Sequence, residues 1–134
     1  MGRIMAFAER RSSVSVPQRQ VNWRGRSGRF YALTPERGAK LDADSLAYDR
    51  VLDQQGKLIV AEALQSVKTA KTVRRRQGKR LITDGPFAET KEQLLGFIMV
   101  EADTLDEALD IAAGIPLAEI GTIEVRAIYD IPGS

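Results

Sequence analysis

Charged side chains gather around residues 84–92, beside a glycine-proline turn. The residues that could do chemistry there are Asp84, Glu89, Lys91 and Glu92. Loops held on a rigid scaffold often carry function, and a carboxylate in such a loop can act as a general base or anchor a ligand. We therefore take Asp84 as the candidate catalytic residue, with Glu89 and Lys91 as candidate ligand-binding residues.

The same turn also has a purely structural explanation. Asp84 can bond nearby backbone N–H groups, Phe87 can fill the core, and residues 89–92 can cap a short helix. Backbone geometry alone is enough to explain why Asp, Gly and Pro occur together in a turn. The sequence therefore favours the structural explanation at this motif, and the catalytic one stays open beside it.

Two further charged residues fall in segments that we expect to be strands. A charge that points inward from a strand is costly unless it is paired, so Glu62 and Arg126 are candidate ligand-binding residues of a cleft, or an ion pair. Solvent-facing positions on half-exposed strands would explain both residues equally well.

The composition excludes several kinds of site. The 134 residues include no histidine and no cysteine, which rules out disulfides, thiolate chemistry, histidine-zinc sites and Ser-His-Asp triads. We expect no metal and no cofactor. Carboxylates, lysine, tyrosine and hydroxyls remain for any chemistry, and a carboxylate acting alone needs burial to raise its pKa towards neutrality.

The length and composition suit one soluble globular domain. The chain is 43% hydrophobic and 28% charged, and no stretch is long enough to span a bilayer. Because it contains no cysteine, the chain would fold unaided in a reducing compartment. We expect a cytoplasmic protein without a membrane partner.

The first half of the chain predicts a helix, a strand and a hairpin. Thr34 and Pro35 suit the start of a helix, and Gly56 suits its end. Residues 57–64 form a short apolar strand candidate. Residues 72–76 and 79–83 flank Gln77-Gly78 and predict a β-hairpin with a strongly basic exposed face.

The second half predicts two more strands and one more helix. Residues 90–94 form at most a helical turn, and residues 97–100 are a buried-strand candidate. Thr104 and Glu107 fit a capping box, which starts a helix that ends near Gly114. Residues 123–127 alternate as a last strand. The order lacks only one initial strand to become βαββαβ.

Residues 84–92 also carry a family resemblance. Their nine residues, Asp-Gly-Pro-Phe-Ala-Glu-Thr-Lys-Glu, resemble the segment that names the DGPF branch of the YCII-related proteins. The resemblance spans roughly residues 33–130. It implies a ferredoxin-like βαββαβ fold with an inserted β-hairpin, in which the sheets of two subunits pack together as in dimeric α+β barrel proteins.

The resemblance implies a family more clearly than a reaction. We expect a homodimer that binds or transforms a small molecule in a cleft between the sheet and residues 84–92, with Lys91 and Arg126 as anion contacts. Some YCII-related proteins resemble enzymes that use a His-Asp pair to eliminate halide from a chlorinated ring, and a chain without histidine cannot carry that pair. The alternative is a non-catalytic regulatory or interaction module of a bacterial alternative sigma factor circuit.

The N-terminus departs from the family pattern. Residues 1–37 contain eight Lys/Arg and two acids, so we separate an atypical basic segment, 1–29, from a domain at 30–131. Either residues 4–8 supply the first strand and a long basic loop follows, or unrelated sequence replaces the native strand. Our hypothesis is that residues 1–29 are disordered, or that they arise from a wrong start or reading frame.

The basic segment also raises a nucleic-acid alternative. Phosphate contacts from residues 1–29 and from the basic hairpin would bind RNA or DNA. Residues 38–134 contain twelve Lys/Arg against sixteen acids. Because the region that resembles the family is net negative, the sequence disfavours a nucleic-acid partner.

Overall fold

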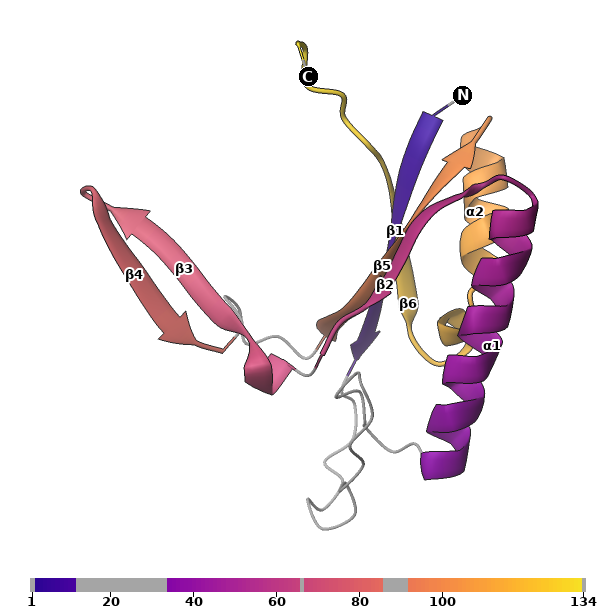
Figure 1. Ribbon diagram of the computed structural model, residues 1–134, viewed down its shortest axis with the longest axis horizontal. Coiled ribbons are helices and arrows are strands. Elements are labelled where there is room, and N and C mark those ends of the chain that lie inside the picture. Colours follow the sequence, from indigo (N-terminus) through magenta and orange to yellow (C-terminus); the bar gives the residue numbers. More distant parts are fainter. Residues whose placement is uncertain (1, 12–33, 66, 86–91, 134) are drawn as a thin grey trace.

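The computed structural model describes residues 2–11, 34–65, 67–85 and 92–133 (Figure 1). Its elements follow the chain in this order: β1 (Gly2–Arg11), α1 (Pro35–Gln54), β2 (Leu58–Ala63), the 3-10 helix η2 (Val67–Thr69), β3 (Lys71–Arg76), β4 (Lys79–Asp84), β5 (Glu92–Ala102), α2 (Leu105–Gly114), the 3-10 helix η3 (Pro116–Glu119) and β6 (Thr122–Ala127).

Four strands form one antiparallel sheet in the order β2-β5-β1-β6, and β3 pairs with β4 in a separate hairpin. Both α-helices lie on the same face of the sheet (Figure 1). Without the hairpin, the order of elements is βαββαβ. The expected α+β fold of ferredoxin-like type, with a hairpin inserted between β2 and β5, is therefore confirmed.

The first strand of this sheet comes from residues that the sequence left uncertain. β1 lies between β5 and β6 and pairs with both, so that Ile4 is opposite Val100 on one side and Ala127 on the other. Residues 4–8 thus supply the missing strand, which starts before the expected boundary at residue 30. The expected basic loop lies largely outside the described residues, and the hypothesis of a wrong start stays a prediction.

Local signals explain where the two α-helices begin and end. The Thr34 side chain accepts a hydrogen bond from the Arg37 amide at 3.3 Å, and Gly56 follows α1 with a φ of 69°. At the start of α2, Thr104 accepts from the Glu107 amide at 3.1 Å. Both expected helix starts are confirmed. In the part of the chain that the structure describes, no helix has both the length and the apolarity that crossing a membrane requires.

The core lies between the helices and one face of the sheet. Side chains alternate between the two faces of a strand, so Ile98 and Val100 of β5 point to the helices while Phe97 and Met99 point away. The buried cluster on the helix side consists of Leu52, Ile98, Val100, Ala102, Ala108 and Ile111. No described helix covers the opposite face of the sheet (Figure 1).

One expected element is wrong. Residues 92–94, which we expected in a helical turn, are the first residues of β5, where Gln93 and Leu94 pair with Arg10 and Glu9 of β1. The ladder with β1 supplies backbone hydrogen bonds that favour the extended conformation over a turn of helix. The local sequence could not reveal this, because the partner strand lies more than 80 residues earlier.

The β3–β4 hairpin projects away from the sheet (Figure 1). Gln77 and Gly78 connect the strands with φ values of 50° and 74°, which are typical of a two-residue type I′ hairpin turn. Side chains from Val73 to Asp84 are exposed. The expected hairpin, with its glycine at positive φ and its basic exposed surface, is confirmed.

Candidate functional site

A cleft of about 460 Å³ lies between α1, η3 and the strands β2 and β5. Its volume falls within the range of small-molecule sites. The apolar residues that border it are Leu46, Ala61, Ala63, Leu95, Gly96, Phe97, Ile98, Ile115, Pro116 and Leu117. Of these, Phe97 directs its side chain to the opposite face of the sheet. The polar residues that border it are Asp42, Ser45, Tyr48, Asp49 and Glu62.

Gly96 makes the floor of this cleft possible. A Cβ atom at this position would lie 2.5 Å from the Glu62 carbonyl oxygen, which is closer than real contacts allow. Beside it, the Leu64 amide donates to the Leu95 carbonyl at 2.8 Å. The absence of a side chain at Gly96 thus lets β2 and β5 approach closely where both strands line the cleft.

Asp49 is the most unusual charged residue of the cleft. Its side chain is half-buried on α1, and this burial raises the pKa of the Asp49 carboxyl above its ordinary value. Within the described residues, no donor forms a hydrogen bond or an ion pair with this carboxylate. A desolvated carboxylate without such partners is suited to exchange a proton or to bind a ligand cation.

Tyr48, the neighbouring residue, is held in place by α2. Its hydroxyl donates a hydrogen bond to the Ile111 carbonyl at 2.7 Å, and a Cβ atom at Gly114 would collide with that hydroxyl. Burial raises the pKa of Tyr48, and the charge of Asp49 raises it further. Tyr48 therefore stays protonated at neutral pH and packs one wall of the cleft against the end of α2.

The charge of the cleft is one-sided. Asp42 and Asp49 contribute two carboxylates from α1, and none of the described lining residues is Lys or Arg. Glu62 borders the cleft, but it lies opposite Phe97 in the sheet, so its carboxylate lies on the helix-free face. Among the described residues, no three acidic side chains come together as a metal ligand set would. An apolar cleft with acidic walls suits a small molecule that has an apolar body and a cationic or hydrogen-bond-donating group.

The structure separates the residues that the sequence proposed for the site. Glu62 lines the cleft, whereas Arg126 lies exposed on β6 and pairs with Glu124 at 2.8 Å. Asp84, the candidate catalytic residue, lies at the end of β4 with 87% of its side chain exposed, and pairs with Lys71 across the hairpin. Of these three residues, only Glu62 borders the cleft, and its side chain lies on the helix-free face with that of Phe97, its cross-strand neighbour.

The remaining candidates, Glu89 and Lys91, lie outside the described residues, as does Phe87. The described start of the motif shapes the root of the hairpin. The Gly85 amide donates to the Ala70 carbonyl at 2.8 Å, and the Thr72 hydroxyl donates to the Gly85 carbonyl at 2.7 Å. With a φ of 93° at Gly85, these bonds give Gly85 a structural role, and the catalytic role of Asp84 stays a prediction.

Sequence reasoning missed Asp49 because it read α1 for its apolar spacing alone. Tyr48 belongs to that apolar stripe, and Asp49 looks like one of several solvated acids on the same helix. A carboxylate directly after a core tyrosine was the available signal. The cleft that Asp49 borders is completed by β5 and η3, which lie far from α1 in the sequence.

The profile of the YCII-related domain family matches residues 25–132. The chain belongs to this family. An uncharacterized protein of Rhizobium meliloti (strain 1021) is 39% identical over 99 residues, which cover 72% of this chain and 80% of the relative. These matches confirm the resemblance that the sequence showed. In this YCII-related protein, the cleft beside Asp49 is the candidate site that the fold itself reveals.

Proposed function

We propose that this YCII-related protein binds a small molecule in the cleft and that Asp49 exchanges a proton with it. The observation that carries the proposal is the half-buried Asp49 carboxylate. Burial raises its pKa, and no described residue forms a hydrogen bond or an ion pair with it. A base with a raised pKa accepts a proton more readily than an exposed carboxylate does. In a chain without histidine, acid–base chemistry near neutral pH requires a carboxylate with a raised pKa, and Asp49 is such a carboxylate.

The walls of the cleft define the class of ligand. Apolar side chains from β5 and η3 would cover the body of the molecule, while the Asp49 carboxylate would bind a protonated amine or an acidic N–H, O–H or C–H group. An anionic ligand would meet repulsion from the acids of α1, Asp42 and Asp49. The substrate class is therefore a small, largely apolar, neutral or cationic molecule.

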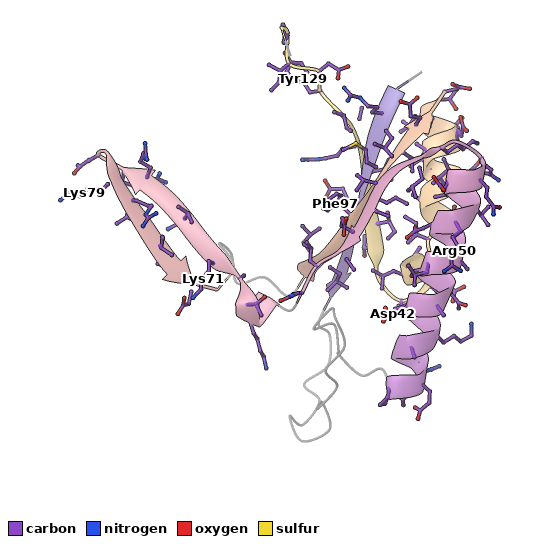
Figure 2. The ribbon with its side chains drawn as sticks, in the orientation of Figure 1. Asp42, Arg50, Lys71, Lys79, Phe97 and Tyr129 are labelled. Atoms are coloured by element: carbon purple, nitrogen blue, oxygen red, sulfur yellow. The ribbon has the colours of Figure 1, made fainter. Side chains whose placement is uncertain are left out.

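A homodimer is the second part of the proposal. Val60, Phe97 and Met99 are half-buried on the sheet face that no described helix covers, and Phe97 lies on that side of the sheet (Figure 2). Two sheets pack readily through such apolar faces, and a second copy offers the same face under two-fold symmetry. The family's usual dimeric arrangement supports this choice.

The ligand part of the proposal can be tested with two probes of nearly the same shape. Benzylamine and benzoate differ in charge, so we expect benzylamine alone to shift the NMR amide resonances of Ala61, Ala63 and Gly96, which line the cleft. Binding should weaken as the pH falls through the raised pKa of Asp49, because protonation removes the charge that attracts the amine. A direct ¹³C titration of the Asp49 carboxyl measures that pKa.

A pair of variants makes the test specific. Asp49→Asn should abolish the benzylamine shifts, whereas Asp53→Asn, which changes an exposed acid on the same helix, should preserve them. Equal binding of benzoate would contradict the proposal, and so would unchanged benzylamine binding by Asp49→Asn. The sigma factor and nucleic-acid alternatives stay predictions, since they depend on the family resemblance and on residues that are largely outside the described ranges.

A further inference from the structure

The β3–β4 hairpin exposes apolar side chains that nothing in the described chain covers. The strands pair with each other and make few contacts with other described elements. Val73, Leu81 and Ile82 are 62%, 47% and 52% exposed. An isolated two-stranded hairpin is only marginally stable in water, so these apolar residues would be stabilised by cover from outside the hairpin.

The charges at the hairpin tip also indicate a partner outside the hairpin. The cross-strand register places Arg75 opposite Arg80 and Arg76 opposite Lys79. Like charges directly opposite each other destabilise a strand pair. In the part of the chain that the structure describes, no acid pairs with Arg74 or with any of these four cations. The tip therefore needs anions from outside the hairpin.

This chain itself supplies the complementary charge. Residues 71–84 contain six Lys/Arg and one acid, a net charge of +5, whereas the rest of residues 38–134 contains six Lys/Arg and fifteen acids, a net charge of −9. A basic projection on an acidic body is attracted to the body of another copy. The same acidic body repels a nucleic acid, and the apolar pair Val73–Ile82 gives phosphates nothing to bind.

The direction of the hairpin brings it to a second copy. It leaves the sheet on the helix-free side, with Lys71 near its root and Lys79 at its tip (Figures 1 and 2). A copy seated on the helix-free face would lie beside it. We propose that the β3–β4 hairpin is an arm that clasps a second copy, with Val73 and Ile82 packed against it and the tip cations paired with its carboxylates.

This inference depends on the proposed homodimer, and charge reversal in the full chain tests it. Sedimentation equilibrium of Arg75→Glu/Arg80→Glu should show a dimer dissociation constant about tenfold or more above wild type, as expected when close charge pairs across an interface are lost. The control, Lys40→Glu/Arg50→Glu, changes the net charge equally on α1, which lies across the molecule from the arm (Figure 2). It should leave the constant within about twofold of wild type, because it removes no contact across the interface.

A second measurement identifies which copy the arm touches. The arm contains few lysines, so a carbodiimide, which couples amines to carboxylates, can report on Lys79. In an equal mixture of ¹⁴N and ¹⁵N protein, coupling should join Lys79 of one copy to carboxylates of the other, which gives peptides that contain both isotopes. The mixed-isotope peptides should disappear in Lys79→Arg. The benzylamine shifts of Arg75→Glu/Arg80→Glu should match those of the wild type, so that cleft function and arm function are scored separately.

Three results would overturn the proposed arm while leaving the homodimer in place. The first is a dimer constant of Arg75→Glu/Arg80→Glu that stays within twofold of the control. The second is Lys79 coupling only within one chain. The third is a pair of observations: a short DNA duplex binds the arm at physiological salt, and Arg75→Glu/Arg80→Glu leaves dimerisation unchanged. Together they would show that the arm binds nucleic acid. A wild-type protein that stays monomeric would remove both the homodimer and the arm, but would leave ligand binding at Asp49 standing.

Discussion

Asp49 combines a cost in stability with a proposed use in the cleft. Burial raises its pKa, so as the pH rises the unfolded chain releases this proton before the folded chain does. Stability therefore falls between the ordinary pKa of an aspartate and the raised value, and the loss persists above it. We predict that Asp49→Asn melts a few degrees above wild type at pH 7, since the neutral amide carries no such penalty.

At pH 3 the wild-type carboxyl is protonated, so Asp49→Asn and wild type should melt at nearly the same temperature. Thermal melts at the two pH values provide the measurement, with Asp53→Asn as the control for an exposed acid of α1. An Asp49→Asn protein that is less stable than wild type at pH 7 would mean that the carboxylate makes a stabilising contact, and would exclude this account of its burial.

Gly114 determines where the Tyr48 ring can lie. A Cβ atom at Gly114 would overlap the Tyr48 hydroxyl, so Gly114→Ala should displace the ring and break its hydrogen bond to the Ile111 carbonyl. We expect a loss of about 1–3 kcal/mol in the free energy of unfolding, as for overpacking combined with a lost buried hydrogen bond. The cost should be smaller in a Tyr48→Phe background, which chemical denaturation of the double-mutant cycle can measure.

At the scale of elements, Gly96 controls the spacing of β2 and β5. Gly96→Ala places a methyl group against the Glu62 carbonyl, so the strands must separate and the hydrogen bond from the Leu64 amide to the Leu95 carbonyl should weaken. We expect faster hydrogen exchange at Leu64 and a loss of roughly 1–3 kcal/mol in stability, within the range for overpacking. Gly96→Val should be worse than Gly96→Ala, and equal stability of all three proteins would refute the spacing argument.

An ion pair joins the start of β2 to α2. The Lys57 ammonium pairs with the Glu107 carboxylate, which lowers the pKa of Glu107 and raises that of Lys57. The Glu107 contribution is present above its ordinary pKa and is lost as the pH falls through the lowered value. The Lys57 contribution is present below its ordinary pKa and is lost as the pH rises through the raised value.

Lys57→Met should therefore lower the melting temperature by a few degrees at pH 7, and the difference should shrink as the pH falls through the lowered pKa of Glu107. Lys40→Met is the matched control, because Lys40 forms an i,i+4 pair with Asp44 on an exposed helix face and such pairs contribute little. An equal loss in both variants would show that the Lys57 pair has no special role between elements.

The elements that depend on local chemistry were predictable from the sequence. Thr34 and Thr104 start their helices by accepting backbone N–H groups within one turn, and Gly78 completes its hairpin through its own φ. The start of β5 was wrong, because it depends on pairing with β1 across most of the chain. At the site, the roles expected for Glu62 and Arg126 stay predictions, whereas Asp49 stands out only once β5 and η3, far along the chain, complete the cleft beside α1.

At the scale of the whole molecule, we expect a charged substitution to act differently on the two sides of the sheet. Met99 is half-buried on the face that no described helix covers, whereas Leu109 is 46% exposed on α2. If a second copy covers the helix-free face, Met99→Glu would bury charges at the interface, and their desolvation would oppose association. We predict that Met99→Glu is folded and monomeric at concentrations where wild type is dimeric.

Leu109→Glu makes the same change on the helix side and should remain dimeric, which sedimentation velocity and circular dichroism can show together. A dimeric Met99→Glu would move the interface off the sheet face, and a monomeric Leu109→Glu would place it on α2. The arm leaves the sheet on its helix-free side (Figure 1), which is also the face to which Met99 points by strand alternation. Loss of the face contact should therefore also release the arm. Hydrogen exchange of Val73 and Ile82 should then accelerate in Met99→Glu but not in Leu109→Glu, which links the uncovered face and the exposed hairpin as two parts of one interface.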